Sequence, residues 1–237
     1  MTQLAAQTAL VTGANRGLGR EFVHQLLERG ADKVYAAARD PQTIVVTDPR
    51  VVPLQLDVTD AMSVARAAEV AGDVSVVVNN AGISVAARVL DGDTAQLRRE
   101  LEVNLFGPLA VTSAFAKHVA ARSGVVVNVA SVLSWLALGG SYSVSKAALW
   151  SATDSMRLEL GPRGVQVVGV YMGYVDTDMA ARVDAPKTAP AEVVHQVLDG
   201  IEAGALEVMA DDLTRAVRGG LQQPVDERYA AFLPEAA

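Results

Sequence analysis

The 237-residue chain contains no cysteine. Disulfide bonds, thiolate nucleophiles and cysteine-ligated metals are therefore excluded, and a reducing compartment fits this composition. No apolar run approaches the ~20 residues that a membrane-spanning helix needs, and residues 1–7 lack the basic and apolar segments of a signal peptide. We expect a cytoplasmic protein with no membrane partner.

Basic residues are scarce as well. Lys and Arg number 20 against 27 Asp and Glu, which gives a net charge of −7. Because binding to a polyanion needs a basic face, we expect no nucleic-acid partner. His24, His118 and His195 are scattered without a carboxylate pattern, so no metal site is expected. The length and the 51% hydrophobic content predict an ordered single domain over residues 1–237.

Short apolar runs alternate with helical patterns along the chain. The runs predict strands at Thr8–Thr12, Lys33–Ala38, Val51–Leu56, Val74–Val78, Gly124–Val129, Val165–Tyr171 and Leu206–Met209. Between them, apolar spacing predicts a helix that stops at Gly30 and helices at Val64–Ala71, Leu97–His118, Tyr142–Leu160 and Pro190–Ile201. Strands that are apolar on both faces and separated by helices indicate an α/β fold, a doubly wound parallel sheet with helices on both faces. Its ligands would lie beyond the carboxyl ends of the strands.

A glycine-rich segment, Thr12–Gly19, lies between the first strand and the first helix. Glycines let the main chain approach a pyrophosphate, and the helix N-terminus offers free N–H groups and a positive dipole. An ordinary glycine-rich turn is the alternative, which the strand–turn–helix context disfavours. The predicted cofactor-binding residues here are Gly13, Asn15, Arg16, Gly17, Leu18 and Gly19.

Two arginines indicate which dinucleotide binds. Arg39 follows the second strand, where an acidic residue would accept hydrogen bonds from the ribose hydroxyls of NAD. Together with Arg16 it can clamp a 2′-phosphate, so we predict NADP(H) over NAD(H). Asp40 lies one step further on and opposes this interpretation. The alternative is that the arginines are solvated surface charges.

Two strand ends add candidate cofactor contacts. Asp57 can accept a hydrogen bond from an adenine amino group while Val58 offers its main chain, although an Asp at this place also caps helices. The small residues that close the fourth predicted strand would let a cofactor lie against the main chain, although they also read as a turn. These are Asn80, Ala81 and Gly82.

Tyr142 and Lys146 indicate the part of the site where the reaction would take place. They are four residues apart on a predicted helix and so share one face. Ser131 ends the preceding strand.

With these motifs in order over Ala9 to Met179, the sequence resembles a compact short-chain dehydrogenase/reductase. The resemblance implies a Rossmann-like sheet of about seven strands, a nicotinamide cofactor and reversible carbonyl–alcohol chemistry. It also implies four catalytic residues. Tyr142 would be the general acid or base, and Lys146 would lower its pKa and bind the nicotinamide ribose. Ser131 would hydrogen-bond the substrate oxygen, and Asn104 would hold a water for proton relay.

The sequence departs from the family pattern in two places. Only eleven residues separate Ser131 from Tyr142, and Ser134 is a fallback for the serine role. Met172 stands where the family usually has proline, which we expect to loosen the following loop. Val175, through its main chain, and Thr177 would still hold the nicotinamide carboxamide.

The substrate wall is expected to be apolar and to fit a hydrophobic ketone, aldehyde or secondary alcohol. The expected wall residues are Leu133, Trp135, Leu136, Leu138, Tyr174 and Met179. Residues 180–191 are short for a substrate lid, which predicts an open site. The predicted function is that of an NADPH-dependent carbonyl reductase or alcohol dehydrogenase. The alternatives are a non-catalytic NADP(H)-binding sensor on the same fold and, less suited to this length, a sugar epimerase or dehydratase.

The resemblance also implies assembly into a homodimer or homotetramer through the long helix and the Tyr142 helix. An apolar stripe on the latter would form the interface: Ala147, Ala148, Leu149, Trp150 and Met156.

Overall fold

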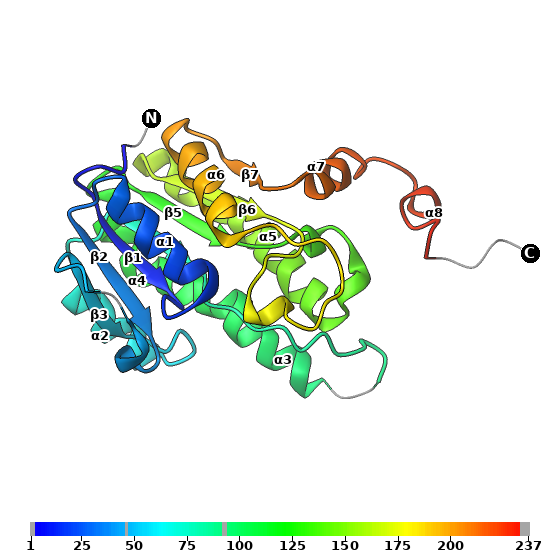
Figure 1. The fold of residues 1–237 in the computed structure, drawn as a ribbon, viewed down its shortest axis with the longest axis horizontal. Helices are drawn as coiled ribbons and strands as arrows, with labels where there is room; N and C mark the ends of the chain where they lie inside the picture. Colours follow the sequence, from blue (N-terminus) through cyan, green and yellow to red (C-terminus); the bar gives the residue numbers. More distant parts are fainter. Residues whose placement is uncertain (1–2, 46, 92–93, 233–237) are drawn as a thin grey trace, which may run out of the picture.

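The computed structural model describes residues 3–45, 47–91 and 94–232. Its centre is a seven-stranded sheet in the order β3-β2-β1-β4-β5-β6-β7, with every neighbouring pair parallel (Figure 1). The predicted strands are confirmed, with ends that move by at most two residues. They are β1 (Thr8–Thr12), β2 (Lys33–Ala38), β3 (Val51–Gln55), β4 (Val76–Asn79), β5 (Val125–Val129), β6 (Gln166–Tyr171) and β7 (Glu207–Met209).

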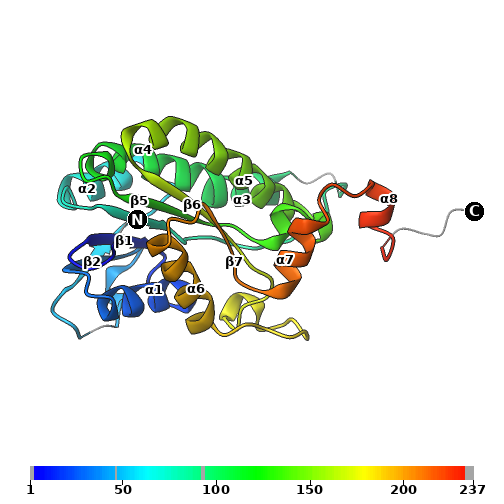
Figure 2. The same ribbon diagram turned by 90° about the horizontal axis from the view of Figure 1, so that it is seen from above.

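Helices cover both faces of the sheet, as predicted. Figure 2 shows α1 (Gly17–Glu28) and α6 (Pro190–Glu202) on one side, and α2 (Ala61–Val70), α4 (Gly107–Ala120) and α5 (Ser141–Leu160) on the other. The strand order reverses between β1 and β4, which is the point where doubly wound sheets bind ligands. None of the described helices is long and apolar enough to cross a bilayer.

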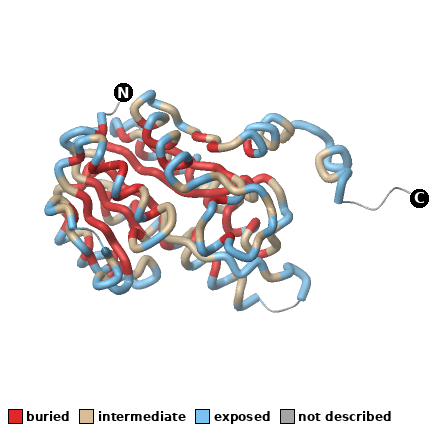
Figure 3. Tube along the Cα trace, viewed as in Figure 1, coloured by how far each residue is buried: buried red, intermediate tan, exposed pale blue. Residues whose placement is uncertain are grey.

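The central strands are buried on both faces because they are runs of valine. Val77, Val126 and Val167 are neighbours across β4, β5 and β6, and each is at most 1% exposed. Figure 3 shows this buried sheet between layers of half-buried helices. Branched side chains pack well on a pleated surface, so the same residues that favour the strands also build the core.

The predicted long helix Leu97–His118 is interrupted. It divides into α3 (Ala95–Leu101), a π-helical turn at Glu102–Phe106 and α4. Pro108 follows this turn and has no N–H to continue the helix, and the Gly107 N–H donates to the Glu102 carbonyl oxygen five residues earlier. The irregularity lies in the wider turn before it, which holds Asn104 buried.

The predicted interface stripe on α5 is wrong in part. Leu149 and Met156 are 1% and 6% exposed and belong to the core of the chain itself. Because α5 packs on the sheet, these two side chains point inward and cannot meet a second subunit. Only Ala147, Ala148 and Trp150 of the stripe remain half-buried.

Two C-terminal helices were not predicted. They are α7 (Asp212–Gly219) and α8 (Val225–Arg228), which extend past β7 and away from the sheet (Figures 1 and 2). Asp211 caps α7 by accepting hydrogen bonds from the Thr214 N–H at 2.8 Å and hydroxyl at 2.7 Å. Tyr229 follows α8, and its hydroxyl accepts a hydrogen bond from the Ala137 N–H at 3.1 Å. The C-terminal segment is thereby tied to the loop that precedes α5.

Candidate active site

A cavity of about 1530 Å³ lies at the carboxyl edge of the sheet. One end is lined by the glycine loop between β1 and α1, and the other by Ser131, Tyr142 and Lys146. Parallel strands bring these segments together because their carboxyl ends all meet at one edge. All of the predicted site residues except Gly19 and Asn104 line this cavity; those two lie buried behind its wall.

The glycine loop has the geometry of a phosphate cradle. Gly13 and Gly17 have φ values of +65° and +52°, which L-residues rarely adopt. A Cβ on Gly19 would collide with the Gly13 carbonyl oxygen, so only glycine allows α1 to start this close to the strand. Arg16 caps α1 without a side-chain hydrogen bond, which leaves the first helical N–H groups free for an anion.

The loop after β4 is bound to the glycine loop. Thr12 Oγ1 accepts hydrogen bonds from the N–H groups of Asn80 and Ala81, both at 3.0 Å. Asn80 Nδ2 donates to the carbonyl oxygens of Thr12 at 2.9 Å and Gly13 at 3.2 Å. These bonds join the two loops into one continuous surface, against which a cofactor can lie.

Arg16 and Arg39 line the same end of the cavity. Arg16 also forms an ion pair with Asp178 at 2.8 Å, a partner that sequence reasoning missed. Arg39 forms no ion pair within the described residues. The Asp40 carboxylate accepts the Gln42 N–H at 3.0 Å and so caps a short turn. Arg39 is therefore the freer of the two cations for a 2′-phosphate.

Asp57 and Val58 also line this end. Asp57 Oδ1 accepts hydrogen bonds from the N–H and hydroxyl of Thr59, and these bonds, with the positive charge of Arg39, lower the pKa of the Asp57 carboxyl. The carboxylate is thus held charged at the strand end. The alternative helix-capping role falls to Asp60, which accepts the Met62 N–H.

Tyr142 and Ser131 meet at the opposite end of the cavity. The Tyr142 hydroxyl is hydrogen-bonded to Ser131, which lowers its pKa, but burial outweighs this bond and raises the pKa well above the ordinary value of 10.0. Without a further positive charge, the tyrosine is therefore a phenol. Ser134, the fallback for the serine role, is buried and does not line the cavity.

Lys146 lies beside this pair. Its Nζ is 5.6 Å from the centroid of the Tyr142 ring and donates to the Val129 carbonyl oxygen at 2.8 Å. The residue is 4% exposed, and burial lowers the pKa of its amine to about 8. The ammonium is thus present at neutral pH, although the surroundings disfavour it.

This depressed pKa predicts a pH-dependent stability. An amine with a pKa of about 8 when folded and 10.5 when unfolded gains folding stability as pH rises through that window. Lys146→Met removes this titrating group. The difference in unfolding free energy between wild type and variant should therefore shift in favour of wild type by about 3 kcal/mol from pH 7 to pH 10.5. Urea denaturation at both pH values measures it. The same substitution at the exposed Lys117 should leave the difference constant, and a constant difference for Lys146 would contradict the pKa.

The Asn104 side chain connects three segments. Its Oδ1 accepts the Ile83 N–H at 2.9 Å, and its Nδ2 donates to the Ile83 carbonyl oxygen and to Ser145 Oγ, both at 2.9 Å. The π-helical turn thus inserts Asn104 between the β4 loop and α5. The predicted water-relay role stays a prediction, whereas the observed contacts are those of a structural clamp.

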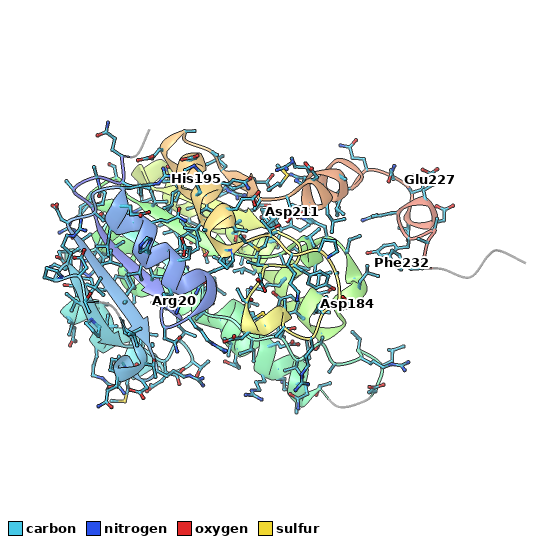
Figure 4. The ribbon with its side chains drawn as sticks, viewed as in Figure 1. Arg20, Asp184, His195, Asp211, Glu227 and Phe232 are labelled. Carbon is cyan, nitrogen blue, oxygen red and sulfur yellow. The ribbon has the colours of Figure 1, made fainter. Side chains whose placement is uncertain are left out.

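The loop after β6, where proline is missing, is bound to two neighbouring segments. The Gly173 N–H donates to Asp211 Oδ2 at 2.6 Å, and the Met172 carbonyl oxygen accepts the Val132 N–H at 2.8 Å. Asp211, labelled in Figure 4 at the start of α7, thus anchors the loop, and its predicted loosening stays a prediction. Val175 and Thr177 follow this loop and line the cavity.

The predicted apolar wall is present except for Trp135. That side chain is 5% exposed, stacks on Tyr171 with ring centroids 4.3 Å apart, and does not line the cavity. A large ring next to an apolar strand end is buried more favourably in the core than at a wet wall. The wall instead continues onto C-terminal residues that sequence reasoning missed because the segment has little patterning: Leu213, Ala216, Val217, Gln223, Arg228 and Phe232. Figure 4 shows Phe232 beside the loop that precedes α5.

Within the described ranges, no group of three or more His, Asp or Glu could hold a metal ion. One cavity thus brings together the glycine loop, the side chains of Arg16 and Arg39, and the group of Tyr142, Ser131 and Lys146. The glycine contacts and the free helix N-terminus fit a dinucleotide.

The doubly wound sheet and this cavity define a nucleotide-binding α/β protein. The family model described as short chain dehydrogenase matches residues 7–188. A short-chain dehydrogenase of Penicillium crustosum is 37% identical over 184 residues, which cover 72% of this chain and 66% of that protein. An uncharacterized oxidoreductase of Myxococcus xanthus is 33% identical over 88% of both chains. The chain belongs to the short-chain dehydrogenase family.

A solved structure gives a further comparison. The crystal structure of a short-chain dehydrogenase from Burkholderia cenocepacia in complex with NADP is 40% identical in sequence. It superposes with a TM-score of 0.94 and covers 98% of this chain and 100% of its own. The predicted family and the predicted fold are thus confirmed.

Proposed function

We propose that the protein is an NADPH-dependent carbonyl reductase, which runs in reverse as an alcohol dehydrogenase. The observation that carries this proposal is a single cavity with a tyrosine–serine–lysine group at one end and an arginine-flanked phosphate cradle at the other. The glycine loop would hold the phosphates of a dinucleotide, and Tyr142, Ser131 and Lys146 would lie at its reactive end.

NADP(H) is supported over NAD(H) by the arginines and by a relative. Arg39 is available for a 2′-phosphate, and the Asp40 carboxylate is turned to the Gln42 N–H. The Burkholderia protein, 40% identical, was crystallised with NADP. A guanidinium group binds phosphate oxygens through two parallel hydrogen bonds, which gives the discrimination.

Each residue of the catalytic group has a distinct task. The bound nicotinamide supplies or accepts the hydride. In reduction, Tyr142 donates its phenolic proton to the carbonyl oxygen, and Ser131 donates a hydrogen bond to that oxygen as charge develops on it. In oxidation, Tyr142 takes the alcohol proton, which requires the phenolate. Lys146 stabilises that phenolate by its charge.

The wall residues support a hydrophobic ketone, aldehyde or secondary alcohol. Leu133, Leu136 and Leu138 come from the loop before α5, Tyr174 and Met179 from the segment after β6, and Leu213 and Val217 from α7. An apolar wall around a few polar groups favours an apolar substrate body with one reacting oxygen.

The test follows NADPH consumption at the dihydronicotinamide absorbance band over a panel of hydrophobic ketones and aldehydes, with NADH in parallel. Turnover with NADPH and little with NADH is expected. Turnover with NADH alone would overturn the cofactor assignment and keep the reductase. NADPH binding without turnover of any panel member would favour a non-catalytic sensor.

A further inference from the structure

Glu100 on α3 is the only acidic side chain among the described residues that is buried, at 0% exposure. It has no cationic partner: the ion pairs of the described residues do not include it. A buried carboxylate without a counter-charge is expensive to keep, and an amide or apolar residue would fill the same place at less cost. Its retention next to the active site needs a reason.

One oxygen of this carboxylate holds the segment Ile83–Ala87, here called the strap. Glu100 Oε1 accepts the N–H groups of Val85 at 2.6 Å and Ala86 at 3.1 Å. Ala86 has a φ of +53°, a strained value for a residue with a side chain. The two hydrogen bonds therefore stabilise a strained part of the backbone. The other oxygen, Oε2, is buried and has no hydrogen-bond partner.

The strap connects Glu100 to the reacting end of the cavity. Ile83 at its start is held by Asn104, and Ala87 at its end exchanges two hydrogen bonds with Ser141, at 2.9 and 3.0 Å. Ser141 directly precedes Tyr142, and Ile83, Ser84 and Ala86 line the cavity. Displacement of the strap would therefore move both the wall and the first turn of α5.

We propose that Glu100 is a positioning residue of this enzyme: its buried carboxylate holds the strap against the reacting end of the cavity and thereby fixes the cavity wall and the first turn of α5, which carries Tyr142. The effect on turnover rests on the proposed reductase function, whereas the hydrogen bonds to the strap are independent of turnover.

Two variants separate the hydrogen bonds from the charge. Glu100→Gln keeps an acceptor oxygen for Val85 and Ala86 and removes the charge, whereas Glu100→Ala removes both. Glu159→Gln removes an exposed carboxylate from the far end of α5 and is the matched control. Amide hydrogen exchange of the strap and the KM and kcat for carbonyl reduction are measured for all four proteins.

In Glu100→Ala, exchange at Val85 and Ala86 should accelerate about 10-fold or more, and KM should rise. In Glu100→Gln, exchange and KM should stay near their wild-type values, because the amide oxygen still accepts both N–H groups. Unchanged exchange in Glu100→Ala would overturn the positioning role, and an equal acceleration in Glu100→Gln would overturn the assignment of that role to the acceptor oxygen. If wild type shows no turnover, the reductase function fails, and the exchange measurement still decides the role in the strap.

Discussion

Replacing Tyr142 by Phe is expected to lower kcat by about 10²–10⁴-fold, the usual contribution of a positioned general acid or base. The substitution removes one oxygen, so it removes the proton donor and the hydrogen bond to Ser131 while leaving the ring in place. Cofactor affinity should change little, because the glycine loop and Arg39 lie at the other end of the cavity. Steady-state kinetics and fluorescence titration with NADPH measure the two quantities separately.

Tyr174→Phe is the matched control. Tyr174 lines the same cavity but is 46% exposed and lies on the segment after β6, so loss of its hydroxyl should change kcat by less than about 3-fold. Comparable losses in both variants would mean that the cavity tolerates no change at all rather than that Tyr142 transfers the proton. Retained activity in Tyr142→Phe would contradict the mechanism outright.

The second large effect concerns the cofactor. Arg39→Ala should raise KM for NADPH by about 10–100-fold, which corresponds to the loss of charge-assisted hydrogen bonds to a phosphate. KM for NADH should stay nearly constant, since NADH has no 2′-phosphate. Arg16→Ala should have a smaller effect, because the Arg16 guanidinium is already paired with Asp178.

Arg20→Ala provides the control for this experiment. Arg20, labelled in Figure 4 on α1, is exposed and does not line the main cavity, so its loss removes the same charge without touching the proposed site. Equal losses for NADPH and NADH in Arg39→Ala would show that the residue supports the loop rather than the 2′-phosphate. If Arg20→Ala raised KM for NADPH equally, the change in net charge would explain both results.

The motifs predict the site well because their chemistry is local. The glycine loop needs residues that tolerate positive φ and close approach, and these needs are visible in Gly13, Gly17 and Gly19 alone. Tyr142 and Lys146 share a helix face by their spacing of four. The valine runs likewise predict their own burial, since strands that are apolar on both faces have no solvent-facing side.

Other features depend on contacts between distant segments. Trp135 belongs to the core because Tyr171 offers a stacking partner from β6, which no local pattern indicates. The loop after β6 is anchored because Asp211, 38 residues further along, accepts its N–H. Asn104, in the break of the long helix, donates to Ile83 and Ser145, which lie on two segments that only the folded sheet brings together.

By itself, the sequence determined the sheet, the family resemblance and the residues at the two ends of the cavity, because strand burial, glycine geometry and helix spacing act over a few residues. The tertiary structure alone decided which apolar residues form the wall, which arginine is free for a phosphate, and that Glu100 is buried against the strap. Burial and electrostatic coupling depend on the distances between segments far apart in the chain. Those distances are set by packing and not by the order of residues.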